Sequence, residues 1–191
     1  KLYGLFEDGT VAVLDPATGV ATARVKLEAM LPAGVAATVD FNPAADRLRI
    51  IGSDGTNLRA NVDDGKVVRD GALKFAEADA SAGTAPRVVA GAYTNAYKGA
   101  KETVLYDVDG RGALLRQAPP NDGILNTVGP LGVADMAVAF DIVAADAGAS
   151  EGWLMAGPVL YRVDLASGKA SSVGTVKGVQ AAKDIAILPA R

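Results

Sequence analysis

The chain has neither cysteine nor histidine among its 191 residues. Without cysteine there can be no disulfide, no thiolate metal site and no thiol nucleophile. Without histidine the usual general base, the usual zinc ligand and the side chain that titrates near neutral pH are all missing. Any catalysis would therefore depend on Asp, Glu, Lys, Arg, Tyr, Ser or Thr.

Clustered positive charge and long apolar runs are also missing. The net charge is −3 and no basic stripe is visible, which argues against nucleic acid as a partner because phosphate binding needs grouped Lys and Arg. No apolar run approaches the ~20 residues of a membrane helix, so no membrane span is expected. Hydrophobic residues make up 50% of the chain, enough to bury a core, and we expect one domain over residues 1–191.

Glycines punctuate the chain at regular places. Four of them close a turn before a short outer strand, and three of these are followed six residues later by a second glycine, with Val25 in the fourth case. The turn glycines are Gly19, Gly65, Gly123 and Gly168, and the second glycines are Gly71, Gly129 and Gly174. Between them lie short alternating segments bounded by turn signals such as SDG, DDG and ASG. Such a repeat predicts four-stranded sheets around an axis, the blades of a β-propeller.

Four repeat units account for the whole chain. They span residues 37–70, 88–128 and 136–173, and the fourth joins Asp184–Leu188 to residues 2–26. The predicted fold is therefore all-β, a four-bladed β-propeller-like ring closed by pairing of N- and C-terminal strands. The pairing can occur within one chain, giving a closed monomer, or between chains, giving a polymer. Residues 73–80 are expected to form at most one or two helical turns.

Four segments support a family resemblance. DFNPAADRLRIIGSDGTNLRANVDDG, DGALKFAEADASAGTAPRVVAGAYTN and PPNDGILNTVGPLGV, together with LYRVDLASGKASSVG, resemble a bacterial family of secreted proteins catalogued as a domain of unknown function. The resemblance spans nearly the whole chain. It implies propeller-like β repeats and an extracytoplasmic location, and it supplies no activity.

The first residue is Lys1 rather than Met, and a strand is expected to begin at once. This start is typical of a mature form from which a leader has been removed. With the resemblance, it predicts a secreted or extracellular protein, with the periplasm as an alternative.

Aspartates recur on the expected innermost strands. Asp40, Asp141 and Asp184 align at one position in three of the four units. A ring of carboxylates repels itself unless it is protonated or holds a cation, and hard cations such as Ca²⁺ accept several such oxygens. We therefore consider a calcium site formed by these three residues. The alternative is that each Asp caps backbone amides where its strand starts.

A second group of polar residues lies in the first unit. Period-two alternation places its members on one face of two paired strands. The group consists of Arg47, Arg49, Asn57, Arg59 and Asn61. Arginine suits bidentate contact with carboxylate, sulfate or phosphate, so the face could bind an anionic or glycan ligand. The alternative is a network between blades, with Asp40, Asp46 and Asp63 as partners.

The string DVDG at residues 107–110 resembles the start of a calcium loop but lacks the further ligands of an EF-hand. We expect a turn in which Asp107 and Asp109 bind backbone amides.

The sequence favours a non-catalytic extracellular binding or structural module and identifies no catalytic residue. One alternative is a self-assembling subunit of a filament or layer, built by strand pairing between molecules. Another is a carboxylate-based enzyme of the lyase or glycosidase type, since paired carboxylates suffice for glycoside hydrolysis.

Overall fold

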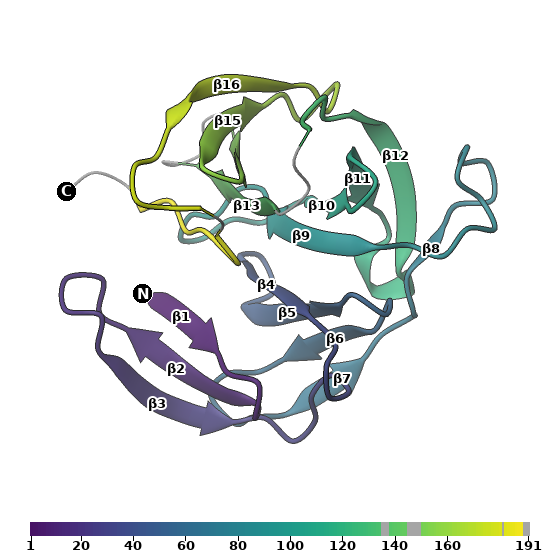
Figure 1. Ribbon diagram of the computed structural model, residues 1–191. Helices are drawn as coiled ribbons and strands as arrows, with labels where there is room; N and C mark the ends of the chain where they lie inside the picture. The colour runs from purple at the N-terminus through teal and green to yellow at the C-terminus, as the bar shows by residue number, and fades with distance from the viewer. Residues whose placement is uncertain (135–137, 145–149, 181, 189–191) are drawn as a thin grey trace.

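The computed structural model describes residues 1–134, 138–144, 150–180 and 182–188 (Figure 1). These residues form sixteen β-strands and one 3-10 helix, η1 (Pro120–Asp122). The predicted all-β class is confirmed. Within the described ranges, no helix is long and apolar enough to cross a bilayer.

Four sheets stand around an axis as the blades of a four-bladed β-propeller. Blade 1 consists of β4 (Ala37–Asn42), β5 (Arg47–Gly52), β6 (Asn57–Ala60) and β7 (Val67–Arg69). Blade 2 consists of β9 (Val88–Tyr93), β10 (Leu105–Asp109), β11 (Ala113–Gln117) and β12 (Ile124–Pro130), with β8 (Lys74–Phe75) parallel to β12. Blade 3 consists of β13 (Val138–Val143), β14 (Glu151–Ala156), β15 (Val159–Val163) and β16 (Ala170–Thr175). Blade 4 consists of β1 (Leu2–Leu5), β2 (Thr10–Leu14) and β3 (Ala21–Lys26).

Two local expectations differ from the structure. The helical turns expected at residues 73–80 are replaced by β8, because Leu73 and Phe75 are buried in the core between blades 1 and 2. The pairing expected between Asp184–Leu188 and the first strand is not formed. Blade 4 has three strands, and residues 182–188 contain none. They dock instead on blade 3, where the Ile187 amide donates a 2.6 Å hydrogen bond to Asp141 Oδ2.

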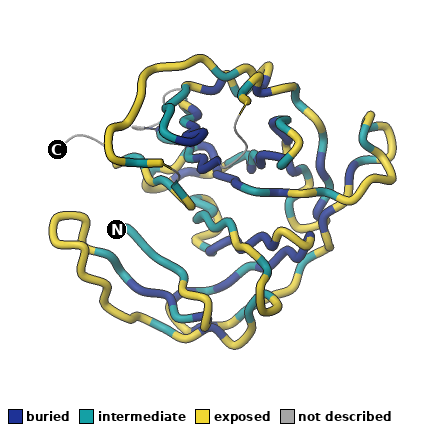
Figure 2. The backbone as a smooth tube through the Cα atoms, in the orientation of Figure 1, coloured by how far each residue is buried: buried dark blue, intermediate teal, exposed yellow. Residues whose placement is uncertain are grey.

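Three hydrophobic clusters fill three interfaces between consecutive blades. Val11 packs with Ile50 between blades 4 and 1, Ile51 packs with Tyr93 between blades 1 and 2, and Ala90 packs with Phe140 between blades 2 and 3. Figure 2 shows buried stretches of the strands in dark blue and exposed turns around the outside of the ring in yellow. Alternation along each strand sends one face to the preceding blade and the other to the following blade.

The repeated glycines also lie at these interfaces. The turn glycine of one blade rests on the outer strand of the blade before it: Gly65 on Lys26, Gly123 on Gly71 and Gly168 on Gly129. All three turn glycines are buried and adopt positive φ, and a Cβ atom on any of them would strike a neighbouring carbonyl oxygen. The sequence repeat therefore records a backbone-to-backbone contact between blades.

We predict that Gly65→Ala lowers the free energy of unfolding by about 3 kcal/mol, because it adds a clash with the Lys26 carbonyl to the cost of φ +79°. The matched control is Gly34→Ala, at φ +82° with nothing within 4 Å, which should lose only about 1 kcal/mol. Urea unfolding of both variants measures the difference, and equal losses would contradict the contact.

Candidate ligand-binding site

The polar face of blade 1 is the most distinctive surface of the molecule. Arg49 on β5 lies directly opposite Arg59 on β6, as the alternation predicts, and Arg59 lies opposite Val68 on β7. The face looks toward blade 2, since Arg49 Nε donates a 3.1 Å hydrogen bond to the Tyr93 hydroxyl. The structure divides the five predicted residues between two environments.

The inner part of this face is a buried network between blades. Arg49 is only 2% exposed, and its Nη1 donates to Asn57 Oδ1 at 2.8 Å and to Asp70 Oδ2 at 2.6 Å. Its Nη2 donates to Asn121 Oδ1 at 2.8 Å, in the 3-10 helix of blade 2. Asn57 in turn donates to the carbonyls of Gly71 and Pro120. Arg49 and Asn57 are therefore fully engaged in joining two blades.

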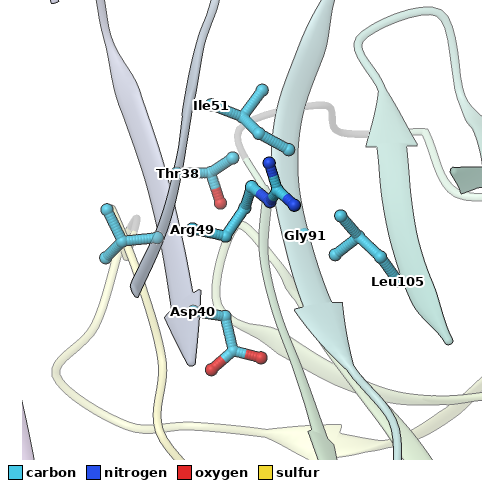
Figure 3. Close-up of a pocket in the computed structure, with 7 residues that line it drawn as sticks. Thr38, Asp40, Arg49, Ile51, Gly91 and Leu105 are labelled. Carbon is cyan, nitrogen blue, oxygen red and sulfur yellow. The ribbon is translucent and has the colours of Figure 1, made fainter. Parts of the chain in front are cut away.

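Figure 3 shows the inner end of this interface. Arg49 and Ile51 of β5 face Gly91 and Leu105 of blade 2 across a small pocket that has no room for a water molecule. The Asp40 carboxyl points away from the Arg49 guanidinium. A ligand cannot reach Arg49 through this pocket.

The carboxylate of the network is Asp70, a residue outside the five-residue group that the alternation indicates. It accepts two hydrogen bonds from Arg59, at 2.6 and 2.8 Å, besides the one from Arg49. Burial alone would raise the pKa of Asp70, but the bonds from the two arginines outweigh it and the pKa lies below its usual value. Extending the alternation from β6 across to β7 would have placed Asp70 on this face.

The three partners expected for the network have other roles. Asp63 forms an ion pair with Arg24 of blade 4. Asp46 accepts a 2.7 Å hydrogen bond from Arg47 through its backbone carbonyl and not through its carboxylate. Asp40 binds backbone amides at the axis. The network between blades therefore exists, with Asp70, Tyr93 and Asn121 in place of these residues.

The outer part of the face is an open pocket of about 220 Å³. It contains the other three predicted residues, together with three from the turn and strand that follow. The lining residues are Arg47, Arg59, Asn61, Asp64, Lys66 and Val68. Three cations therefore surround it with a single carboxylate, in a protein whose net charge is −3.

Neighbouring groups orient the two arginines of the pocket. Arg47 Nη1 donates to the Asp46 carbonyl at 2.7 Å, and the Arg59 guanidinium is fixed by its two bonds to Asp70. Lys66 lies 3.8 Å from Asp64, a loose and exposed ion pair. Fixed guanidinium groups with spare N–H donors suit a planar or tetrahedral anion.

The three axial aspartates cap backbone amides. Oδ1 of Asp40, Asp141 and Asp184 each accepts the amide of the next residue. Asp40 Oδ2 also accepts the Tyr93 amide of the following blade, and Asp141 Oδ2 accepts the Ile187 amide, both at 2.6 Å. This pattern aligns Ile187 with Tyr93, so Asp184 lies two residues before the position that Asp40 and Asp141 share.

Burial raises the pKa of Asp40 to about 7, with a further contribution from the charge of Asp141. Burial also raises the pKa of Asp141, and that of the more exposed Asp184 to about 6. The described residues include no group of three His, Cys, Asp or Glu side chains placed to hold a metal ion. Calcium binding by the three aspartates stays a prediction.

Asp107 is the least solvated carboxylate of the described chain. It is fully buried between blades 1 and 2, and neither of its oxygens has a hydrogen-bond partner among the described residues. Burial raises its pKa to about 8 despite the nearby charge of Arg49. The expectation that Asp107 binds backbone amides is wrong, whereas Asp109 accepts the Arg111 amide at 2.7 Å as expected.

The fold and the polar face together define a small β-propeller domain with a cationic pocket on one blade. The chain belongs to a family described as a domain of unknown function, DUF4394, whose family model matches residues 1–186. Among curated proteins none matches the chain. A crystal structure of the computationally designed Ika8 protein is similar, with 14% identity and a TM-score of 0.45 over 98% of this chain. The match covers 49% of the designed chain, so this chain spans about half its length.

We predict that the protein is more stable at pH 5 than at pH 8. The pKa values of Asp40, Asp107, Asp141 and Asp184 are all higher in the folded state than in the unfolded chain, where aspartate titrates near pH 4. The folded protein therefore binds protons more tightly, and its stability falls as the pH rises through these raised pKa values. Thermal unfolding from pH 4 to pH 9 measures this dependence.

The Asp107→Asn variant isolates the largest contributor. It should be more stable than the wild type at pH 5 and still more so at pH 8, where the gain should be larger by ~1 kcal/mol or more, because the amide cannot ionise. The exposed Asp122→Asn should show neither effect. A wild-type protein that is most stable at pH 8 would contradict the assignment.

Proposed function

We propose that this protein is a non-catalytic binding module whose pocket on the outer part of blade 1 takes an anionic group. The observation that carries the proposal is the convergence of Arg47, Arg59 and Lys66 on a 220 Å³ hollow in an acidic molecule. Asn61 adds an amide group for polar contacts. A carboxylated or sulfated glycan fits this chemistry, as does a carboxylate of a protein partner.

The pocket also offers an apolar contact. Val68 is 51% exposed and lies beside the cations. An exposed valine next to fixed guanidinium groups suits a ligand that combines an anionic group with an apolar face.

The composition of the pocket favours binding over catalysis. Asp64 is its single carboxylate, whereas glycoside hydrolysis needs an acid and a nucleophile or base. The two carboxylates with the most strongly raised pKa values lie outside this pocket, Asp40 at the axis and Asp107 in the core. An extracytoplasmic location, expected from the family resemblance, is part of the same proposal.

Binding of inorganic sulfate and of oligogalacturonate, followed by isothermal titration at low ionic strength, tests the proposal. We predict that Arg47→Ala and Lys66→Ala each weaken the affinity of at least one probe about tenfold, which corresponds to ~1.4 kcal/mol. The affinity should also fall as salt is added.

Arg69→Ala is the matched control. Arg69 is exposed on β7, next to Val68 in sequence and therefore on the opposite face of the strand. Its replacement should leave binding unchanged. Equal effects of all three substitutions, or no binding of either probe by the wild type, would overturn the proposal.

A further inference from the structure

One of the four interfaces of the ring is open. Gly65, Gly123 and Gly168 are buried against the preceding blade, whereas the equivalent Gly19 of blade 4 is exposed with nothing within 4 Å. Gly174 of blade 3 is the glycine on which Gly19 would rest, and a Cβ atom added there would also have no atom within 4 Å. Figure 1 shows the ring interrupted between the sheet that ends with β16 and the sheet that begins with β1.

Most of the exposed large apolar side chains belong to the two blades that border this opening. Of six large hydrophobic residues exposed in the described chain, five belong to blades 3 and 4 or to the segments beside them: Phe6, Val20, Val173, Val176 and Leu188. Val173 stands one residue before Gly174, as Val128 stands before Gly129. Val128 packs into the core between blades 2 and 3, whereas Val173 is 55% exposed. The facing sides of blades 3 and 4 therefore carry the residues of an interface between blades that is not formed.

The missing innermost strand of blade 4 is already near its place. The Ile187 amide binds Asp141 as the Tyr93 amide binds Asp40, and the charges of Asp141 and Asp184 both act on Asp40. Residues 184–188 thus lie at the axis between blades 3 and 1, where an innermost strand belongs. What they lack is the pairing with β1.

We propose that the ring closes within one chain, with residues 184–187 pairing antiparallel to β1 and Gly19 resting on Gly174. The register follows from the other blades. In blade 3 Asp141 lies opposite Trp153 of β14, and in blade 1 Asp40 lies opposite Arg49 of β5. In blade 4 the aligned residue is Ala186.

The position of Tyr3 in β1 is fixed by the outer strands. The two outermost strands of blade 3 and those of blade 4 have a shift in their pairing register. In blade 3 the shift follows Leu160 of β15, which lies opposite Met155 of β14. In blade 4 it follows Val11 of β2, which lies opposite Leu5 of β1. Counting back two residues from each partner matches Tyr3 to Trp153. Closure therefore places Ala186 opposite Tyr3 and Ile187 opposite Leu2.

The same chain, rather than a second copy, is the occupant. Blade 4 is packed on blade 1 through a buried cluster, and residues 184–188 are held on blade 3 of the same ring. Two surfaces joined through one folded body meet at millimolar effective concentration, which exceeds the concentration of other molecules in dilute solution.

Disulfide trapping tests the proposal, and the absence of cysteine makes the result clean. The Leu2→Cys/Ile187→Cys pair should oxidise to a monomer with an internal crosslink. The control pair Leu5→Cys/Ile187→Cys places the first cysteine three residues along and on the other face of β1, and it should crosslink at least tenfold more slowly. Disulfide-linked dimers or ladders would overturn closure within one chain in favour of a second copy. Equal rates for both pairs, or no crosslink in either, would overturn the pairing.

A second measurement does not depend on cysteine geometry. If the interface closes, Gly19→Ala meets Gly174 and should destabilise the protein as much as Gly65→Ala does. If the interface stays open, Gly19→Ala should match Gly34→Ala, because both glycines have positive φ and open surroundings in the structure. The second result would contradict closure.

Discussion

The buried guanidinium of Arg49 is the interaction on which the arrangement of blades 1 and 2 depends. A charged group at 2% exposure is tolerated only when it is paired and its hydrogen bonds are satisfied. Asp70 supplies the opposite charge, and Asn57, Tyr93 and Asn121 accept the other bonds. Because Tyr93 and Asn121 belong to blade 2, the two blades must hold one fixed relation for the charge to be satisfied.

This constraint also shapes the outer pocket. Asp70 neutralises Arg49 and also accepts two hydrogen bonds from Arg59. These two bonds fix the orientation of the Arg59 guanidinium at the edge of the pocket. Away from Asp70 the face opens to solvent, and Arg47 and Lys66 line the hollow with Asp64 as its single carboxylate. One polar face thus changes along its length from a structural joint to a surface suited to an anion.

Much of the fold was readable from the sequence, because the turn glycines recur once per blade and in three of the four blades mark a contact with the preceding blade. The alternation along β5 and β6 likewise placed Arg47, Arg49, Asn57, Arg59 and Asn61 on one face. The division of that face could not be predicted, since it depends on Asn121 and Tyr93, which are distant in sequence. The place of Asp184 relative to Asp40 and Asp141 also depends on a distant contact, because the hydrogen bond to Asp141 aligns Ile187, rather than Ile185, with Tyr93. No alternation pattern reports such a shift, since a displacement by two keeps every side chain on its face.

The central claim is that the polar face of blade 1 is structural at Arg49 and open for binding at Arg47. Urea unfolding of Arg49→Ala and Arg47→Ala tests it most directly. The account predicts that Arg49→Ala loses about 3 kcal/mol or more, because buried partners are left unpaired, and that Arg47→Ala stays within ~0.5 kcal/mol of the wild type. A stable Arg49→Ala variant, or equal losses in the two proteins, would contradict the account.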